Sequence, residues 1–192
     1  TLDRSSAASD VYKRQIAPQR TCTKKKANYN AYKDFLAEDF NHRCGYTDCA
    51  DYWFGGKRCF QIDHFKPESK YPELENEYNN LVYCCSYVNR AKWDDDNPNY
   101  LDPCDVDFNL HFERDDLGFI KAKTTQGQYM VEHMNLDLTR YAICWNLDRL
   151  EEKIKKIGAK VNQNIATNED KELLSKLNME FHKYFEYLRA EL

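Results

Sequence analysis

The last third of the chain carries apolar residues at a spacing that two packed helices satisfy. Two series recur at intervals of three and four residues. They consist of Ile143, Leu147, Leu150, Ile154, Ile157 and Val161, and of Leu173, Leu177, Phe181, Tyr184 and Leu188. This spacing puts the apolar side chains on one face of each helix. Asn168 is a suitable N-cap for the second helix, and Glu169 and Asp170 suit its first turn. We therefore predict an α-helical hairpin at the C-terminus.

The remainder of the sequence alternates between short helices and short strands. The spacing of apolar residues predicts an amphipathic helix over roughly 28–41. A β-hairpin is predicted over 111–123, with its turn at residues 115–118. We expect an α+β fold with a core over 16–125 and a helical region over 126–192 packed on it. Residues 1–15 are polar and without pattern, and we expect them to be a non-native or disordered leader.

Composition limits the class of protein. The 192 residues include 42% hydrophobic and 14% aromatic residues, enough for one compact domain with an appendage. The net charge of −4 argues against indiscriminate coating of nucleic acid, although it leaves room for a local phosphate groove. No apolar run approaches the roughly 18 residues of a membrane span. We expect a cytoplasmic protein with no membrane partner, whose eight cysteines are thiols or metal ligands.

Four polar residues occur where predicted elements meet. Asp63 and His64 end one short strand, Asn80 opens the next, and Asn89 lies on a short helix over 86–93. A strand, a loop, a second strand and a helix bring all four residues to one end of a hairpin. We therefore expect them to form a site.

These residue types suit phosphodiester hydrolysis. The reaction needs a base for water, a cation to neutralise the phosphate, and a group that holds the base in its productive tautomer. The imidazole of His64 can be the base. The Asp63 carboxylate and the Asn89 amide oxygen are hard ligands suited to Mg²⁺. Asn80 can fix the loop that orients His64.

The ordered set IDHFKPES, YNNL and NRAK resembles the motif of HNH endonucleases, the ββα-metal fold, and is similar to the HNH domain of the RNA-guided CRISPR nuclease. The resemblance implies that Asp63 and Asn89 bind Mg²⁺ or Mn²⁺, that His64 is the general base and that Asn80 is structural. It further implies that Lys92, with Arg90 beside it, contacts the backbone phosphate.

A narrower resemblance extends over roughly residues 43–150. HFKPESKYP after the acid position, Leu101-Asp102-Pro103, His111-Phe112 and Gly118 are similar to a bacterial HNH group of restriction and anti-phage defence, including the nuclease subunit of Septu-type systems. This resemblance implies DNA as substrate and, by analogy, an ATPase as partner.

The cysteines depart from the family pattern. Many relatives carry two CxxC pairs that bind a structural zinc. At the corresponding places this chain has Cys44 with Thr47 and Cys85 with Val88, so each pair keeps only its first cysteine. Cys49, Cys59 or Cys84 can substitute, but neighbouring residues on a strand point to opposite faces. We therefore expect no four-thiolate zinc site.

A second function stays open. The same fold can serve as a non-catalytic adaptor in a nucleic-acid-processing complex that docks through its C-terminal helices.

Overall fold

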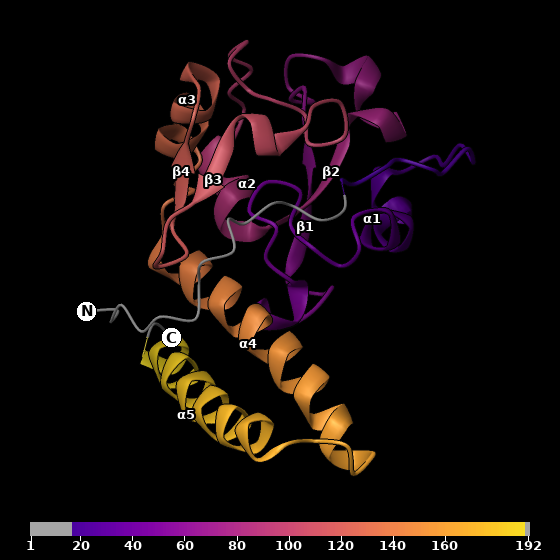
Figure 1. Cartoon of the computed structure of the whole chain (residues 1–192). Coiled ribbons are helices and arrows are strands. Elements are labelled where there is room, and N and C mark those ends of the chain that lie inside the picture. Colours follow the sequence, from indigo (N-terminus) through magenta and orange to yellow (C-terminus); the bar gives the residue numbers. More distant parts are fainter. Residues whose placement is uncertain (1–16, 191–192) are drawn as a thin grey trace.

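A computed structural model describes residues 17–190, so the leader expected over 1–15 lies outside the described residues. Its helices are α1 Lys33–Asp39, α2 Ser86–Lys92, α3 Thr125–His133, α4 Thr139–Asn162 and α5 Asn168–Ala190. Its strands are β1 Phe60–His64, β2 Leu81–Cys85, β3 Phe112–Arg114 and β4 Ile120–Ala122. The described residues thus form five α-helices and two small antiparallel sheets (Figure 1), which confirms the α+β class.

The first sheet and α2 form a β-β-α unit in the middle of the chain. β1 and β2 pair antiparallel, with Asp63 opposite Val82 and His64 opposite Leu81. Every residue of β2 is buried. The run of β-branched and aromatic residues in this strand favours extended structure that is covered on both faces. Both predicted strands and the short helix after them are confirmed.

The core forms where α1 and α4 cover this unit. The predicted N-terminal helix is present as a 3₁₀ turn, Tyr29–Tyr32, followed by α1. Leu36 of α1 and Leu147 of α4 are fully buried in the same hydrophobic cluster as Tyr83 of β2. The apolar face of each amphipathic helix is therefore turned toward the core, as the spacing of its apolar residues predicts.

The second sheet is the predicted hairpin. β3 and β4 pair with Phe112 opposite Ala122, and the connecting turn contains Gly118 at φ +90°. Glycine adopts this left-handed backbone conformation without steric cost. Arg114 of β3 donates hydrogen bonds to the carbonyl oxygens of Thr47 (2.6 Å) and Gly118 (2.6 Å), which ties the hairpin to the segment before β1.

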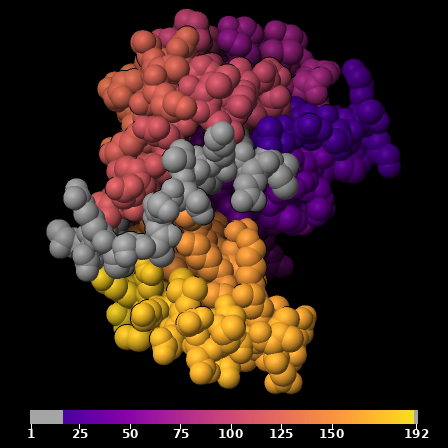
Figure 2. All heavy atoms as spheres, viewed as in Figure 1, coloured from indigo at the N-terminus to yellow at the C-terminus, as the bar shows by residue number. Residues whose placement is uncertain are grey.

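The predicted C-terminal helical hairpin is confirmed. α4 and α5 lie side by side below the two sheets (Figure 1), and together they form a projecting lobe in the space-filling view (Figure 2). Leu177, Tyr184 and Leu188 of α5 are buried as expected. Leu173, which the spacing places on the same face, is 48% exposed. It lies in the first turns of α5, close to the end of the hairpin that projects from the core.

None of the helices between residues 17 and 190 combines the length and the hydropathy needed to cross a membrane.

Candidate functional site

The imidazole of His64 is held at the end of β1 by three neighbours. Its Nε2 lies 2.9 Å from the carbonyl oxygen of Glu75, and the ring of Tyr29 packs edge-on at 4.7 Å between centroids. Its Nδ1 lies 3.7 Å from a carboxylate oxygen of Glu68. A carbonyl oxygen can only accept a hydrogen bond, so Nε2 carries the proton and Nδ1 is the basic nitrogen.

Asn80 pins the loop that follows His64. Its Oδ1 accepts a hydrogen bond from the backbone N–H of Lys66 at 2.8 Å, and its Nδ2 donates to the carbonyl oxygen of the same residue at 3.0 Å. Nδ2 also donates to Leu74 O at 3.4 Å. The carbonyl oxygen of Asn80 accepts from the N–H of Phe65 at 2.8 Å. One buried side chain thus joins both ends of the loop between the strands.

Asp63 faces inward. Its carboxylate is 3% exposed and accepts hydrogen bonds from Tyr46 Oη at 2.6 Å and from Lys92 Nζ at 3.0 Å. Burial raises the pKa of the Asp63 carboxyl, while the ammonium of Lys92 and the hydroxyl of Tyr46 oppose that rise. The carboxylate is therefore occupied within the protein interior.

The structure does not place Lys92 on the polar face of α2. Its side chain is 0% exposed, and Nζ lies 2.8 Å from the carbonyl oxygen of His64 in addition to its contact with Asp63. The residue pattern of 86–93 predicts a helix with its polar face at Asn89 and Lys92, and this is wrong for Lys92 because the buried carboxylate and carbonyl draw the ammonium inward. In this arrangement its ammonium is not available to a phosphate.

Asn89 and Arg90 lie at the surface of α2. Asn89 Nδ2 donates to Oε1 of Gln61 at 2.8 Å. The guanidinium of Arg90 packs over the Tyr87 ring at 5.3 Å from its centroid and remains exposed. Of the two cations expected to contact phosphate, Arg90 is the one that solvent reaches.

The two expected metal ligands, Asp63 and Asn89, are each hydrogen-bonded to other side chains. Carboxylate and amide oxygens have the right chemistry for Mg²⁺. However, both oxygens of Asp63 already accept hydrogen bonds, one from Tyr46 and one from the ammonium of Lys92. A metal ion bound to this carboxylate would lie beside that ammonium, and the two cations would repel each other. Asn89 bonds to Gln61 rather than to Asp63. In residues 17–190 no cluster of three or more His, Cys, Asp or Glu side chains is placed to hold a metal ion. To bind a divalent ion, the Asp63 carboxylate would have to give up one of these hydrogen bonds.

The cysteines around the hairpin are free thiols. Cys44, Cys49, Cys84 and Cys85 are buried, whereas Cys59 is exposed. Cys85 Sγ lies 3.7 Å from Tyr141 Oη, and Cys49 Sγ lies 3.7 Å from the carbonyl oxygen of Tyr141. Thr47 and Val88, at the two places where the resembled HNH pattern has cysteine, are buried in the same region. These side chains fill the interior beside β2 by packing.

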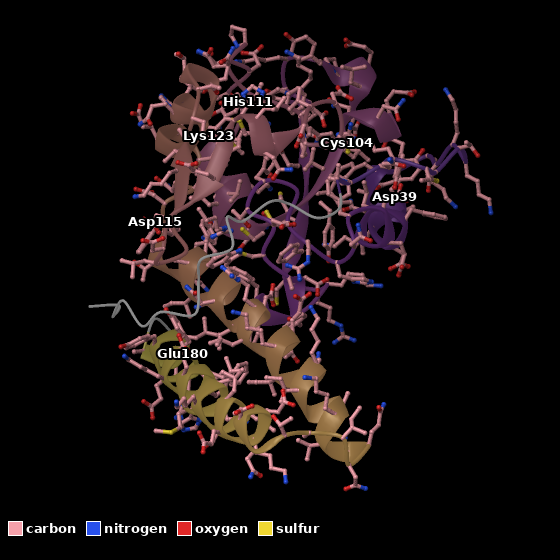
Figure 3. The ribbon with its side chains drawn as sticks, in the orientation of Figure 1. Asp39, Cys104, His111, Asp115, Lys123 and Glu180 are labelled. Atoms are coloured by element: carbon pink, nitrogen blue, oxygen red, sulfur yellow. The ribbon has the colours of Figure 1, made fainter. Side chains whose placement is uncertain are left out.

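His111 lies elsewhere. It is labelled in Figure 3 beside Lys123, at the base of the β3–β4 hairpin. Its Nδ1 lies 2.9 Å from Thr124 Oγ1, and its carbonyl oxygen accepts from the Lys123 N–H at 2.8 Å. These contacts give it a structural role at the start of the hairpin.

The sequence pattern singles out Asp63, His64 and Asn80 but not the residues that contact them. Glu75 acts through its backbone carbonyl, which leaves no side-chain signal. Tyr29 and Tyr46 are aromatic residues in turn regions, a pattern that ordinarily indicates packing.

Comparisons with protein-family models, with curated proteins and with solved structures returned no match.

Proposed function

We propose that this protein hydrolyses phosphodiester bonds in DNA as an HNH-type endonuclease, with His64 as the general base. The observation that carries the proposal is the 2.9 Å contact between His64 Nε2 and the carbonyl oxygen of Glu75. This contact fixes the tautomer in which Nδ1 has a free lone pair, which is what a base for water needs. The β-β-α unit formed by β1, β2 and α2 supports the proposal, because it is the arrangement that the ββα name describes.

The chemistry assigned to His64 is one proton transfer. Nδ1 takes a proton from water as the water oxygen attacks phosphorus, the P–O3′ bond breaks, and the departing O3′ takes a proton from a second water molecule. The products are a 5′-phosphate and a 3′-hydroxyl, the outcome that the resemblance implies. The imidazolium that forms lies near Glu68, whose carboxylate is 3.7 Å from Nδ1. Arg90, the exposed cation of α2, is the residue proposed to contact a backbone phosphate.

The test is cleavage of plasmid DNA, single-stranded DNA and RNA by the purified chain in Mg²⁺, Mn²⁺ and EDTA. We expect cleavage of DNA in Mg²⁺ or Mn²⁺ and none in EDTA. A role in restriction or anti-phage defence, with an ATPase partner, predicts that cleavage increases when the product of a neighbouring gene is added. Failure to cleave any of these nucleic acids, alone or with that partner, would refute the proposal.

A non-catalytic adaptor is the second candidate. It is favoured by the projecting α4–α5 lobe (Figure 2) and by the apolar residues that this lobe exposes, among them Met179 at 72%. If the protein is an adaptor, its His64→Ala variant should support the activity of the complex as well as the wild type does. A nuclease should not, so a complex reconstituted with this variant separates the two functions.

A further inference from the structure

Both oxygens that Lys92 binds belong to consecutive residues at the end of β1. Its Nζ is 3.0 Å from Oδ1 of Asp63 and 2.8 Å from the carbonyl oxygen of His64. The same ammonium lies 5.9 Å from the centroid of the Tyr100 ring, whose face attracts a cation. The ammonium at the end of α2 is therefore hydrogen-bonded to β1 at the two residues where the strand ends, one of which carries the imidazole.

The pair is part of a longer chain of hydrogen bonds. Tyr46 Oη donates to the second oxygen of Asp63 at 2.6 Å, so the carboxylate is held from two directions. Tyr46, Asp63 and Lys92 come from the segment before β1, from β1 itself and from α2. The network thereby locks three separate parts of the chain around the backbone of His64.

Lys92 and the imidazole lie on different sides of β1. Successive side chains of a strand point to opposite faces, so Asp63 and His64 diverge. Because Lys92 Nζ contacts the Asp63 carboxylate and is 0% exposed, it lies on the inner side. A phosphate that approaches the imidazole from solvent does not meet this ammonium.

Burying an ammonium and a carboxylate removes both from water, and such a pair is a poor source of stability. Its better attested use is to specify one geometry among several. The geometry specified here is the path of the backbone at His64. On the other side, the ring itself is held by the Glu75 carbonyl and by Tyr29.

We propose that Lys92 is a positioning residue for the general base. Its buried ammonium fixes the His64 carbonyl and the Asp63 carboxylate, and thereby the direction in which the imidazole leaves the strand, without contacting the substrate. This role differs from the phosphate contact that the family resemblance implies. It rests on the proposed function, since a positioning role requires that His64 acts on a substrate.

The experiment compares Lys92→Met, which keeps the length of the side chain and removes its charge, with two other variants. Arg90→Met removes the exposed cation of the same helix, and Lys156→Met removes an exposed cation on α4. Three quantities are measured: the cleavage rate at saturating DNA, the dissociation constant for DNA in EDTA at several salt concentrations, and hydrogen exchange of the Phe65 amide. Phe65 directly follows His64, and its amide donates a hydrogen bond to the carbonyl oxygen of Asn80.

We expect Lys92→Met to lower the saturating cleavage rate at least tenfold and to speed exchange of the Phe65 amide at least tenfold. Its dissociation constant and salt dependence should stay within twofold of wild type. Arg90→Met should show the reverse, weaker binding with a shallower salt dependence. Lys156→Met should change none of the three quantities.

The double variant Asp63→Asn/Lys92→Met serves if the single variant does not fold, because it leaves no unpaired buried charge. It should also cleave slowly, since the His64 carbonyl has still lost its donor. Weaker DNA binding by Lys92→Met with an unchanged saturating rate would overturn the proposal in favour of a phosphate contact. Unchanged rate and exchange would overturn it as well. If the wild type cleaves nothing, the proposed function fails, while the exchange measurement still decides whether Lys92 holds the strand end.

Discussion

Replacing Asn80 by alanine should lower the free energy of unfolding by about 3–4 kcal/mol. The two shorter hydrogen bonds of its side chain, both to Lys66, contribute about 1 kcal/mol each, and a half-buried N–H left without an acceptor adds about 1–2 kcal/mol. The longer bond to Leu74, at 3.4 Å, adds little. For a chain of this size a loss of about 3 kcal/mol corresponds to a fall in Tm of roughly 6–12 °C.

The neighbouring Asn79 provides a matched control, because it has the same side chain but is exposed. Asn79→Ala should change the free energy of unfolding by less than about 0.5 kcal/mol. Asn80→Asp keeps the acceptor for the Lys66 N–H but turns a buried carboxylate oxygen toward the carbonyl oxygens of Lys66 and Leu74, so its loss should be at least as large as that of Asn80→Ala. Urea denaturation of all three measures these differences. Equal stability of Asn80→Ala and Asn79→Ala would refute the idea that Asn80 anchors the loop that carries His64.

Two further predictions concern groups away from the site. Burial raises the pKa of Asp48 to about 7 from an ordinary value of 3.8, so the folded chain retains a proton that the unfolded chain loses, and stability falls as pH rises from about 4 to about 7. The free energy of unfolding of Asp48→Asn, compared with that of wild type, should therefore rise by about 2–3 kcal/mol as the pH is raised from 4.5 to 7.5, as measured by urea denaturation. A difference between the two proteins that stays constant with pH would contradict this. Gly118→Ala should lower the free energy of unfolding by at least about 2 kcal/mol, because φ is +90° and a Cβ there would lie 2.7 Å from Asn146 Nδ2 and from Trp145 Cε3. Gly158→Ala, in open space on α4, should instead gain up to about 1 kcal/mol, and thermal unfolding of both variants checks the contrast.

Elements with a strong local pattern could be predicted from the sequence. The stripes of α4 and α5, the buried β2 and the turn at Gly118 each follow from spacing or from a residue with special backbone freedom. Leu173 shows the limit of such patterns, because periodicity places a residue on a face but does not say whether a neighbour covers that face. Here α5 begins at Asn168, at the projecting end of the hairpin, and Leu173 stays exposed.

The inner half of the candidate site could not be predicted. A lysine at the end of a short helix ordinarily lies in solvent. The burial of Lys92 depends on Tyr46, Asp63 and Tyr100, which come from three other segments. Likewise, the partner of His64 is the backbone carbonyl of residue 75. Every residue type has a backbone carbonyl, so the identity of this residue gives no signal in the sequence. Such contacts arise only when the fold brings distant segments together.

Single-turnover cleavage of DNA by His64→Ala tests most directly whether His64 is the general base. Removal of a general base lowers a rate by about 10²–10⁴-fold, and we expect a fall of this size with DNA affinity near that of wild type. His182→Ala, which removes an exposed imidazole on α5, should cleave at the wild-type rate. Undiminished cleavage by a folded His64→Ala variant would contradict the assignment.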